Sequence, residues 1–581
     1  MGSDPGEDYM ATILPNHLHT ATGKLATGLI GTVGLLGLTL FSPSAFAVSC
    51  DFRNGDVFTE ICGYIEAGTV QTGGQLRVHV ASTVPNFAIH MQRAGNKDPN
   101  AVTSASFGGA GNYTPSANSY NDLNWGSAYN VGIPSHLTSG IYELSFNNGR
   151  GSYSEFVAIK SAQPGSHSKV LVLDSLPTKI AYSPIGGKSM YGFNSTYGQA
   201  SAEVSMERPT GRGQWTEHRE FVKWLDQQGV TYEAASMMDL HHDPALLSHY
   251  NLVILVGHNE YWSKEMRDNW DNYLAAGGNA AIFSGNTMWW QVRFSADNKH
   301  MICYKNANDD PLKSDNSRVT VNWFSSPVNR PENLSTGVSF KHGGYADYTE
   351  GGIHHPNEGF TVTDASHWAF EGTDLSNGRI FGRESGVVGY EVDGALFKMV
   401  NGKPVVTGED GTPTNFQILA TTPAFAINSP SGIPGIVPNN HNERGWGTLG
   451  VFKPTTTSGT VFVAPTIDWA EGLNDPQVGR ITRNVIERLK YRTQQAPSSS
   501  DNPNAGTSTN AGTSTNNTST NNTSTNNTST NNTSTNNTST NNTSSEPQVA
   551  ASTSGGGGGS LPLSALLLGL LAIFGLKARK P

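Results

Sequence analysis

Cysteine is scarce in this chain, positive charge is in deficit, and the glycine patterns of nucleotide-binding loops are missing. The net charge of −10 over 581 residues argues against nucleic acid as a partner, because phosphate backbones bind proteins through an excess of Lys and Arg. One glycine-rich segment, residues 181–193, has neither the Gly-x-Gly-x-x-Gly nor the Walker spacing, so we set nucleotide binding aside.

The beginning of the chain has the three parts of a secretory signal. Lys24 precedes an apolar run at residues 25–41, and residues 44–47 (Ser-Ala-Phe-Ala) offer a small-x-small cleavage site. The run is short for a membrane span, which disfavours the alternative of a permanent anchor. We therefore predict a signal peptide over residues 1–47 and an exported protein.

A low-complexity stretch occupies residues 494–554. It is rich in Ser, Thr and Asn, and the pentad Asn-Asn-Thr-Ser-Thr repeats from Asn516 towards Ser544. The repeats have no apolar side chain to bury, so folding cannot offset their ordering entropy. This composition predicts a flexible, disordered stalk.

A membrane-sorting tail follows the stalk. Five glycines, Gly555–Gly559, lead into an apolar segment at residues 561–576 and a basic end. Residues 555–581 resemble the Gly-Gly carboxy-terminal sorting signals of Gram-negative bacteria. The resemblance implies a transient inner-membrane anchor, cleavage by a rhomboid-type protease, and type II secretion to the cell surface or the medium. An ordinary tail anchor is the alternative, and the glycines before the apolar segment favour sorting.

Export gives the first two cysteines a role. Cys50 and Cys62 lie close together in a chain predicted to reach an oxidising compartment, so we expect a disulfide between them. Cys303 is left over, and we expect it to be a buried, inert thiol.

The body of the chain begins with a region that predicts a β-sandwich, residues 48–165. Residues 75–80 and 141–146 alternate apolar and polar side chains, as strands with one buried face do. Clusters of Gly, Pro and Asn separate such segments, and helical periodicity is missing.

Strands and helices alternate in residues 166–493. Apolar runs predict buried strands, and amphipathic stretches predict helices between them. We expect strands at residues 170–173, 230–232, 252–256, 279–283 and 459–464, and helices at 217–228, 263–276 and 476–489 and from Asp243 onwards. A β-rich insertion covers residues from about 295 to 450. The pattern predicts a parallel-sheet α/β domain of the amidotransferase or flavodoxin-like class.

Polar side chains follow two of these strands, where sites in open α/β sheets gather. His258 and Glu260 follow the strand ending at Val256, and Asn286 follows the strand at residues 279–283. Two residues apart in extended backbone, His258 and Glu260 point the same way, so they could bind a metal or move a proton. The alternative is that His258 bonds a loop carbonyl while Glu260 caps the next helix.

Several different short motifs lie in the body of the chain, some of them at these strand ends. They are Ala181-Tyr182, Gly186-Gly187-Lys188-Ser189-Met190-Tyr191-Gly192, Met238-Asp239-Leu240-His241, Gly257-His258-Asn259-Glu260-Tyr261-Trp262-Ser263, Ala276-Gly277-Gly278-Asn279, Ser284-Gly285-Asn286, Trp290-Gln291-Val292-Arg293, Gly389-Tyr390-Glu391-Val392-Asp393-Gly394 and Asp468-Trp469. The motifs resemble the large-subunit carboxy-terminal domain of N,N-dimethylformamidase. The likeness covers most of the body, and the Gly-His-x-Glu-Tyr-Trp element is specific in this setting.

The resemblance implies an iron centre. From sequence alone, Tyr182 and Tyr191 read equally as packing aromatics on either side of a glycine turn. By resemblance they would bind one ferric ion per chain together with Glu260, while His258 and Asn286 would be catalytic. Three hard oxygen donors with three negative charges suit such an ion and leave coordination positions open.

Two functions remain after these observations. The first is a secreted metal-dependent hydrolase that cleaves the carbon–nitrogen bond of a small, non-peptide amide. The second is an exported, surface-displayed binding protein for a glycan or small molecule, with stacking platforms at the tryptophans Trp215, Trp289, Trp290 and Trp368. A thiol mechanism of the class I glutamine amidotransferase kind is unlike this chain, because no cysteine follows a predicted strand in an elbow.

Overall fold

The computed structural model describes residues 48–51, 57–66, 68–95, 103–111, 113, 119–126, 128–350, 353–425 and 445–492. The chain divides into two units, residues 1–502 and 503–581, and every described residue belongs to the first. The predicted signal peptide, stalk and sorting tail, with its apolar segment, therefore lie outside the described residues. Within the described part of the chain, no helix has both the length and the apolar character needed to cross a membrane.

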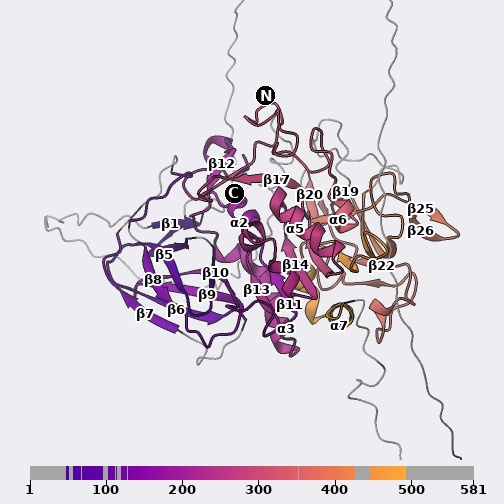
Figure 1. Cartoon of the computed structure of the whole chain (residues 1–581), viewed down its shortest axis with the longest axis horizontal. Coiled ribbons are helices and arrows are strands. Elements are labelled where there is room, and N and C mark those ends of the chain that lie inside the picture. The colour runs from indigo at the N-terminus through magenta and orange to yellow at the C-terminus, as the bar shows by residue number, and fades with distance from the viewer. Residues whose placement is uncertain are drawn as a thin grey trace, which may run out of the picture. The chain divides into compact units, whose positions relative to one another are not determined.

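The amino-terminal region is built from short strands, drawn in indigo and violet in Figure 1. They are β1 (Val48–Asp51), β2 (Val57–Thr59), β3 (Ile61–Ile65), β4 (Thr69–Gln71), β5 (Gln75–Ser82), β6 (Phe87–Arg93), β7 (Thr103–Phe107), β8 (Tyr129–Gly132), β9 (Gly140–Asn147) and β10 (Ser152–Lys160). Two sheets, in the strand orders β4-β10-β9-β6-β7 and β3-β5-β8, share one core to which Val78 of β5 and Leu144 of β9 both belong.

A sheet of nine strands forms the centre of the molecule. Its first five strands are parallel: β13 (Glu233–Ala235), β11 (Val170–Leu173), β14 (Leu252–His258), β16 (Asn279–Gly285) and β29 (Val461–Ala464). Four antiparallel strands continue it: β28 (Gly445–Phe452), β27 (Gln417–Ala424), β22 (Phe360–Val362) and β23 (Ile380–Phe381). The predicted insertion thus extends the same sheet. The assignment of the α/β domain to the amidotransferase or flavodoxin-like class stays a prediction.

Helices cover both faces of the parallel strands. They are α2 (Leu176–Tyr182), α3 (Thr216–Gln227), α4 (Met237–His242), α5 (Lys264–Ala275) and α7 (Pro476–Leu489). Side chains of β11 alternate accordingly, because Leu171 and Leu173 join the core beneath α2, α4 and α5, whereas Val170 and Val172 join the core beneath α3 and α7. Both faces are therefore buried, which explains the fully apolar runs in the sequence.

Smaller elements surround this sheet. They are β12 (Glu203–Ser205), β15 (Tyr261–Ser263), β17 (Trp290–Phe294), β18 (His300–Ile302), α6 (Asn333–Thr336), β19 (Ser339–Tyr345), β20 (Tyr348–Glu350), β21 (Ile353–His355), β24 (Glu391–Gly394), β25 (Phe397–Val400) and β26 (Lys403–Val406). Of these, β24 carries Glu391 of the candidate site, and β15 begins directly after Glu260.

Two sequence predictions about local structure were wrong. The strand expected at residues 230–232 lies at Glu233–Ala235, because Glu233 is buried in a set of hydrogen bonds and gives no apolar signature. The helix expected from Asp243 is a short 3-10 turn at Leu246–His249, since Asp243 instead closes α4 as its carboxy-terminal cap.

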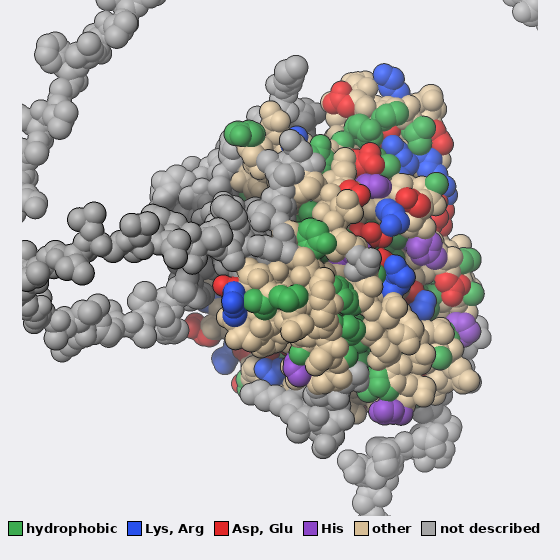
Figure 2. Space-filling model, turned by 90° about the vertical axis from the view of Figure 1, so that its left-hand side faces the viewer, with side chains coloured by type: hydrophobic (Ala, Val, Ile, Leu, Met, Phe, Trp, Pro, Cys, Tyr) green, Lys and Arg blue, Asp and Glu red, His purple; other side chains and the backbone are tan. Residues whose placement is uncertain are grey.

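The sandwich packs directly against the central sheet. Phe156 and Ala158 of β10 belong to the same apolar core as Trp215 and Phe221, and β10 lies beside β13. Arg93 also forms a bidentate pair with the carboxylate of Asp226, with its Nε 3.0 Å from one oxygen. On the face seen in Figure 2, acidic, basic and uncharged side chains are interspersed.

The cysteines follow the expected division. Cys62 is disulfide-bonded, whereas Cys303 is free and 2% exposed. The prediction of a buried thiol is confirmed, and burial raises the pKa of Cys303 to about 12, which disfavours the reactive thiolate. The side chain of Cys50, the predicted partner of Cys62, lies outside the described residues.

Candidate functional site

Three predicted site residues converge beside the carboxyl ends of β11 and β14. The Tyr182 hydroxyl lies 2.9 Å from Glu260 Oε2, and the Tyr191 hydroxyl lies 2.5 Å from Glu260 Oε1. The two hydroxyls are 3.2 Å apart. All three side chains are buried, with Glu260 only 1% exposed. The structure thus brings together the three residues that the resemblance assigns to iron.

His258 adjoins this group and links it to a further carboxylate. Its Nε2 lies 2.8 Å from Glu391 Oε2 and 3.3 Å from Glu260 Oε2. His258 is the last residue of β14, and Glu391 is the first residue of β24. The imidazole therefore stands between two buried carboxylates.

Lys305 supplies a positive charge on the other side. Its Nζ lies 3.3 Å from the ring centroid of Tyr191 and 5.1 Å from that of Trp290. An ammonium over aromatic faces is attracted to their negative quadrupoles. We refer to Tyr182, Tyr191, His258, Glu260, Lys305 and Glu391 together as the Glu260 cluster.

Local structure holds Glu260 against the helix that carries Tyr182. Thr178 of α2 accepts hydrogen bonds through Oγ1 from the backbone N–H of Glu260 at 2.9 Å and of Tyr261 at 3.3 Å. Gly257 has φ +69°, and a Cβ there would lie 2.9 Å from Cβ of Glu217. The turn out of β14 therefore requires glycine.

Electrostatics in the cluster are dominated by burial and excess negative charge. Burial and then the Glu260 charge raise the pKa of both tyrosines well above the usual value. Burial also raises the pKa of Glu260, although the charges of His258 and Lys305 oppose it. Burial alone would lower the pKa of His258, but carboxylates, chiefly Glu391, raise it to about 9.

The donor set fits a hard metal ion. Oxygens bound at about 2 Å to one ion, and at right angles to each other, lie about 2.8 Å apart. The phenol and carboxylate oxygens of Tyr182, Tyr191 and Glu260 are separated by 2.5–3.2 Å, which brackets that spacing. A cation placed among them would also reverse the shifts that keep the phenols protonated.

Asn286 lies at the same sheet edge. Gly285 pairs with His258 in the register of β14 and β16, so Asn286 stands one residue beyond that pair. The backbone N–H of Asn286 donates to Asp393 at 2.8 Å, and φ is +48°. Its side-chain Oδ1 is buried and accepts no hydrogen bond from the described residues.

Sequence reasoning did not assign two members of the cluster. Glu391 lies in the Gly-Tyr-Glu-Val-Asp-Gly motif, which signalled the resemblance but carried no spacing relation to His258. Lys305 lies in a loop after β18 without any motif. Only the fold brings these distant segments beside β14.

The prediction of tryptophan stacking platforms is wrong for three of the four residues, because their side chains are buried. Trp215, Trp289 and Trp290 are 1%, 7% and 7% exposed and belong to the apolar cores. Trp368 is half-buried and packs against the core beneath α3 and α7. Their size and apolar surface are used for packing, so three of the four cannot stack on a ligand.

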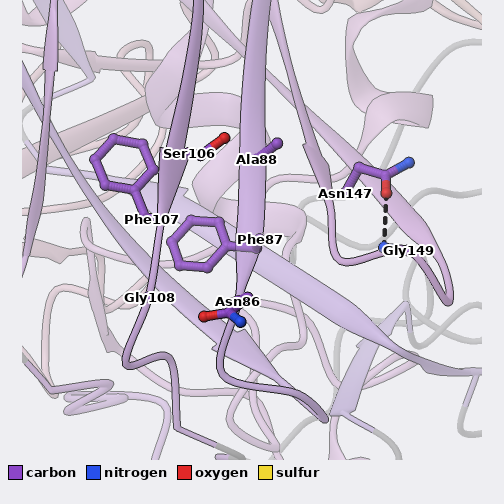
Figure 3. A pocket seen from close by; sticks show the side chains of 8 residues that line it. All are labelled: Asn86, Phe87, Ala88, Ser106, Phe107, Gly108, Asn147 and Gly149. Atoms are coloured by element: carbon purple, nitrogen blue, oxygen red, sulfur yellow. Dashed lines mark hydrogen bonds between the residues drawn. The ribbon is translucent and has the colours of Figure 1, made fainter.

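A hollow of about 550 Å³ lies away from this cluster, on the sandwich. It is lined by Asn86, Phe87, Ala88, Ser106, Phe107, Gly108, Asn147 and Gly149. Figure 3 shows the rings of Phe87 and Phe107 side by side, and the Asn147 side chain bonded to the Gly149 backbone. The lining contains no titratable side chain, so the hollow offers no acid–base chemistry.

Comparison with known families matches the greater part of the chain. Residues 89–483 match the family described as N,N-dimethylformamidase beta subunit-like, C-terminal. The matched region includes the whole Glu260 cluster and most of the sandwich.

Two curated relatives are similar over the same 307-residue length. The N,N-dimethylformamidase beta subunit of Paracoccus aminophilus is 24% identical, and that of Alcaligenes sp is 23% identical. Each match covers 48% of this chain but only 37% of the relative. A solved structure of a ThuA-like protein from Parabacteroides merdae has a TM-score of 0.23 at 14% identity, over 58% of this chain and 94% of that chain.

Proposed function

The chain belongs to the N,N-dimethylformamidase beta subunit-like family, and from that membership we propose that it is a metal-dependent hydrolase of a small, non-peptide amide. The observation that carries the proposal is the meeting of Tyr182, Tyr191 and Glu260 oxygens within 2.5–3.2 Å of each other, beside His258. The reaction consumes water and an amide, breaks the carbon–nitrogen bond, and yields a carboxylic acid and an amine.

One ferric ion per chain is the proposed cofactor. Tyr182, Tyr191 and Glu260 would hold it, since two phenolates and a carboxylate balance its charge and are hard donors. When bound, the ion supplies a Lewis acid that polarises the amide carbonyl and lowers the pKa of water. Lys305, over the Tyr191 ring, adds positive charge that favours the ionised forms of Glu260 and Tyr191.

His258 is the proposed proton donor. Its two carboxylate neighbours favour the imidazolium form, and Glu391 Oε2 lies 2.8 Å from Nε2. During hydrolysis a proton from His258 would reach the amide nitrogen as the carbon–nitrogen bond breaks, so that the amine leaves neutral. The proton released by the attacking water restores the imidazolium.

Asn286 is proposed to bind the substrate. Its buried Oδ1 accepts no hydrogen bond from the described residues, and the left-handed backbone holds it at the edge where β14 and β16 end. A substrate with an N–H or O–H donor would satisfy this oxygen, and the cost of leaving it unpaired would favour such a substrate.

Export belongs to the proposal as well. The signal peptide predicted at residues 1–47 and the sorting tail at residues 555–581 would deliver the folded body to the cell surface or the medium. Metal loading and amide hydrolysis would then take place outside the cytoplasm. The intact mass of the protein recovered from the medium tests this part, because retention of the apolar tail contradicts sorting.

Iron analysis of the purified protein tests the proposal most directly. We expect about one iron per chain, a visible phenolate-to-iron absorption band, and hydrolysis of a simple amide that carries an N–H or O–H group in preference to N,N-dimethylformamide, which has neither. Tyr182→Phe should lower the iron content and weaken and shift the band, because Tyr191 remains as the second phenolate. Tyr273→Phe is the matched control, because the Tyr273 hydroxyl is also buried but donates to the Asn279 carbonyl. A protein that binds no iron and hydrolyses no amide would instead favour the binding-protein alternative.

A further inference from the structure

Arg208 is a buried arginine that contacts three backbone oxygens from two segments of the chain. It is 2% exposed and lies just after β12. Its Nη1 donates to the carbonyl oxygens of Ser183 at 2.6 Å and Lys188 at 3.0 Å, and its Nη2 donates to the carbonyl oxygen of Tyr120. Burying a guanidinium costs free energy unless its N–H groups are hydrogen-bonded. The three carbonyls accept hydrogen bonds from the planar guanidinium group, in a geometry that only arginine can match.

The first two carbonyls belong to the loop that joins the site tyrosines. Tyr182 immediately precedes Ser183, and Tyr191 follows Lys188 by three residues. Arg208 therefore holds Ser183 and Lys188, the first and sixth residues of this eight-residue loop, at a single point. The loop turns through two left-handed glycines, Gly186 and Gly187, and one backbone hydrogen bond, from Met190 N–H to the Ala181 carbonyl at 2.9 Å, joins its ends, so Arg208 adds two further ties between them.

The third carbonyl belongs to the sandwich, which presses on the same loop. A Cβ on Gly186 would lie 2.6 Å from the backbone nitrogen of Tyr120. Ile185, only 3% exposed, packs into a cluster of sandwich residues that includes Cys62 and Trp125. The loop between the tyrosines is thus held between two parts of the molecule.

We propose that Arg208 is a positioning residue for the metal site, which sets the separation of the Tyr182 and Tyr191 hydroxyls by fastening their loop to the sandwich. The proposal rests on the function proposed above for the role of the tyrosines. Lysine cannot replace Arg208, because a single ammonium lacks the planar fork that reaches three fixed carbonyls. The sandwich is accordingly part of the site's construction.

Arg208→Lys tests the proposal in the full-length protein. We expect iron affinity to fall about 10- to 100-fold, as for other partners that orient metal ligands, and the phenolate-to-iron band to shift. Hydrogen exchange of the metal-free protein should rise in residues 183–191. Arg267→Lys is the matched control, because Arg267 is also buried and also donates to two backbone carbonyls, those of Arg330 and Pro331. It should leave the band and the exchange of the loop unchanged.

Two further outcomes are separable. If the wild-type protein binds no iron, the proposed function fails. Hydrogen exchange of residues 183–191 in Arg208→Lys, compared with the wild type, then still tests whether Arg208 holds the loop. If Arg208→Lys does not fold, Gly186→Ala replaces it, since its Cβ would push the loop off the sandwich. Gly211→Ala is its control, with a similar φ of +81° but nothing within 4 Å. Unchanged exchange in the variant that folds would overturn the proposal.

Discussion

Asp310 and Glu260 are both 1% exposed, yet their surroundings differ completely. Asp310 receives two hydrogen bonds from the Arg293 guanidinium, at 2.8 and 2.9 Å, and three more from Thr320 and Leu312. Glu260 shares its space with two phenols, a second carboxylate and an imidazole. Each oxygen of Asp310 is already matched within the chain.

The contrast separates structural from functional burial of charge. Hydrogen bonds from Arg293 and Thr320 outweigh burial and lower the pKa of Asp310 to about 2, whereas the pKa of Glu260 is raised. An ion pair whose oxygens all accept hydrogen bonds within the chain stabilises the fold and has no oxygen left to bind a ligand. The Glu260 cluster, buried and rich in oxygen with raised pKa values, is the kind of group that the proposed cation would complete.

Glu260→Gln should have the largest effect on function and the mildest on the metal-free fold. We expect loss of iron and a fall in amide hydrolysis of more than about 10³-fold, because a metal ligand is removed. The thermal midpoint of the metal-free variant should not fall, since the amide relieves the excess negative charge. Iron analysis, activity and calorimetry measure the three quantities. Undiminished iron would remove Glu260 from the ligand set.

His258→Ala should divide the cluster into metal-binding and proton-transfer parts. We expect iron content close to that of the wild type and hydrolysis reduced by about 10²- to 10⁴-fold, the range for loss of a general acid. Iron content and kcat on the same preparation provide the check. His79→Ala is a suitable control, because His79 is a buried histidine of the sandwich that also pairs with a glutamate, Glu66. Loss of iron in His258→Ala would assign His258 to the metal instead.

Asp310→Asn should affect stability alone. Removing one partner of a buried ion pair leaves the Arg293 charge uncompensated, so unfolding should become easier by about 3 kcal/mol. Iron per folded molecule should be unchanged, which is the reverse of the result expected for Glu260→Gln. Denaturant unfolding with Asp297→Asn, an exposed carboxylate, as the control measures the difference. Equal stabilities of the two variants would refute the structural role of the pair.

Lowering the pH should weaken the ion pair of Asp310 and Arg293 and so reduce the free energy of unfolding, by less than the substitution does. The pKa of Asp310 is about 2 in the folded protein and 3.8 ordinarily, so the unfolded chain binds the proton more readily. Its stabilisation is full above about pH 4 and is lost as the pH falls towards 2, by about 1–2 kcal/mol. Thermal midpoints across this range should drop more steeply for the wild type than for Asp310→Asn. Parallel curves would contradict the assignment.

Local signals allowed several elements to be predicted to their ends. The helix predicted at residues 476–489 from its aligned apolar side chains is α7, with the same two ends, whereas the cap-and-proline signal at Asp243-Pro244 did not give the expected α-helix. Ser263 caps α5, and its predicted apolar face of Met266 and Trp270 is buried. These features depend on residues within one or two turns, which is the range over which sequence patterns operate.

Long-range features could not be predicted in the same way. The motif around Glu260 indicated a site, yet nothing in the sequence pairs His258 with Glu391 or places Lys305 over Tyr191. These contacts exist because β24 and the loop after β18 return to the edge where β14 ends. The assignment of Tyr191 came from family resemblance, since two tyrosines beside a glycine turn would also suit simple packing.

The order of strands in the central sheet has a consequence for synthesis of the chain. The parallel strand β16 has β29 as its outer neighbour, and β29 is separated from it by the whole insertion. Until residues 461–464 have been made, one edge of β16 has no partner, and an unpaired edge invites association with other chains. Glu391 also arrives long after His258. The sheet is therefore completed almost at the end of translation of the body, and the Glu260 cluster only once residue 391 has been made, so a nascent chain that stalls early in the insertion has an open edge and an unfinished cluster.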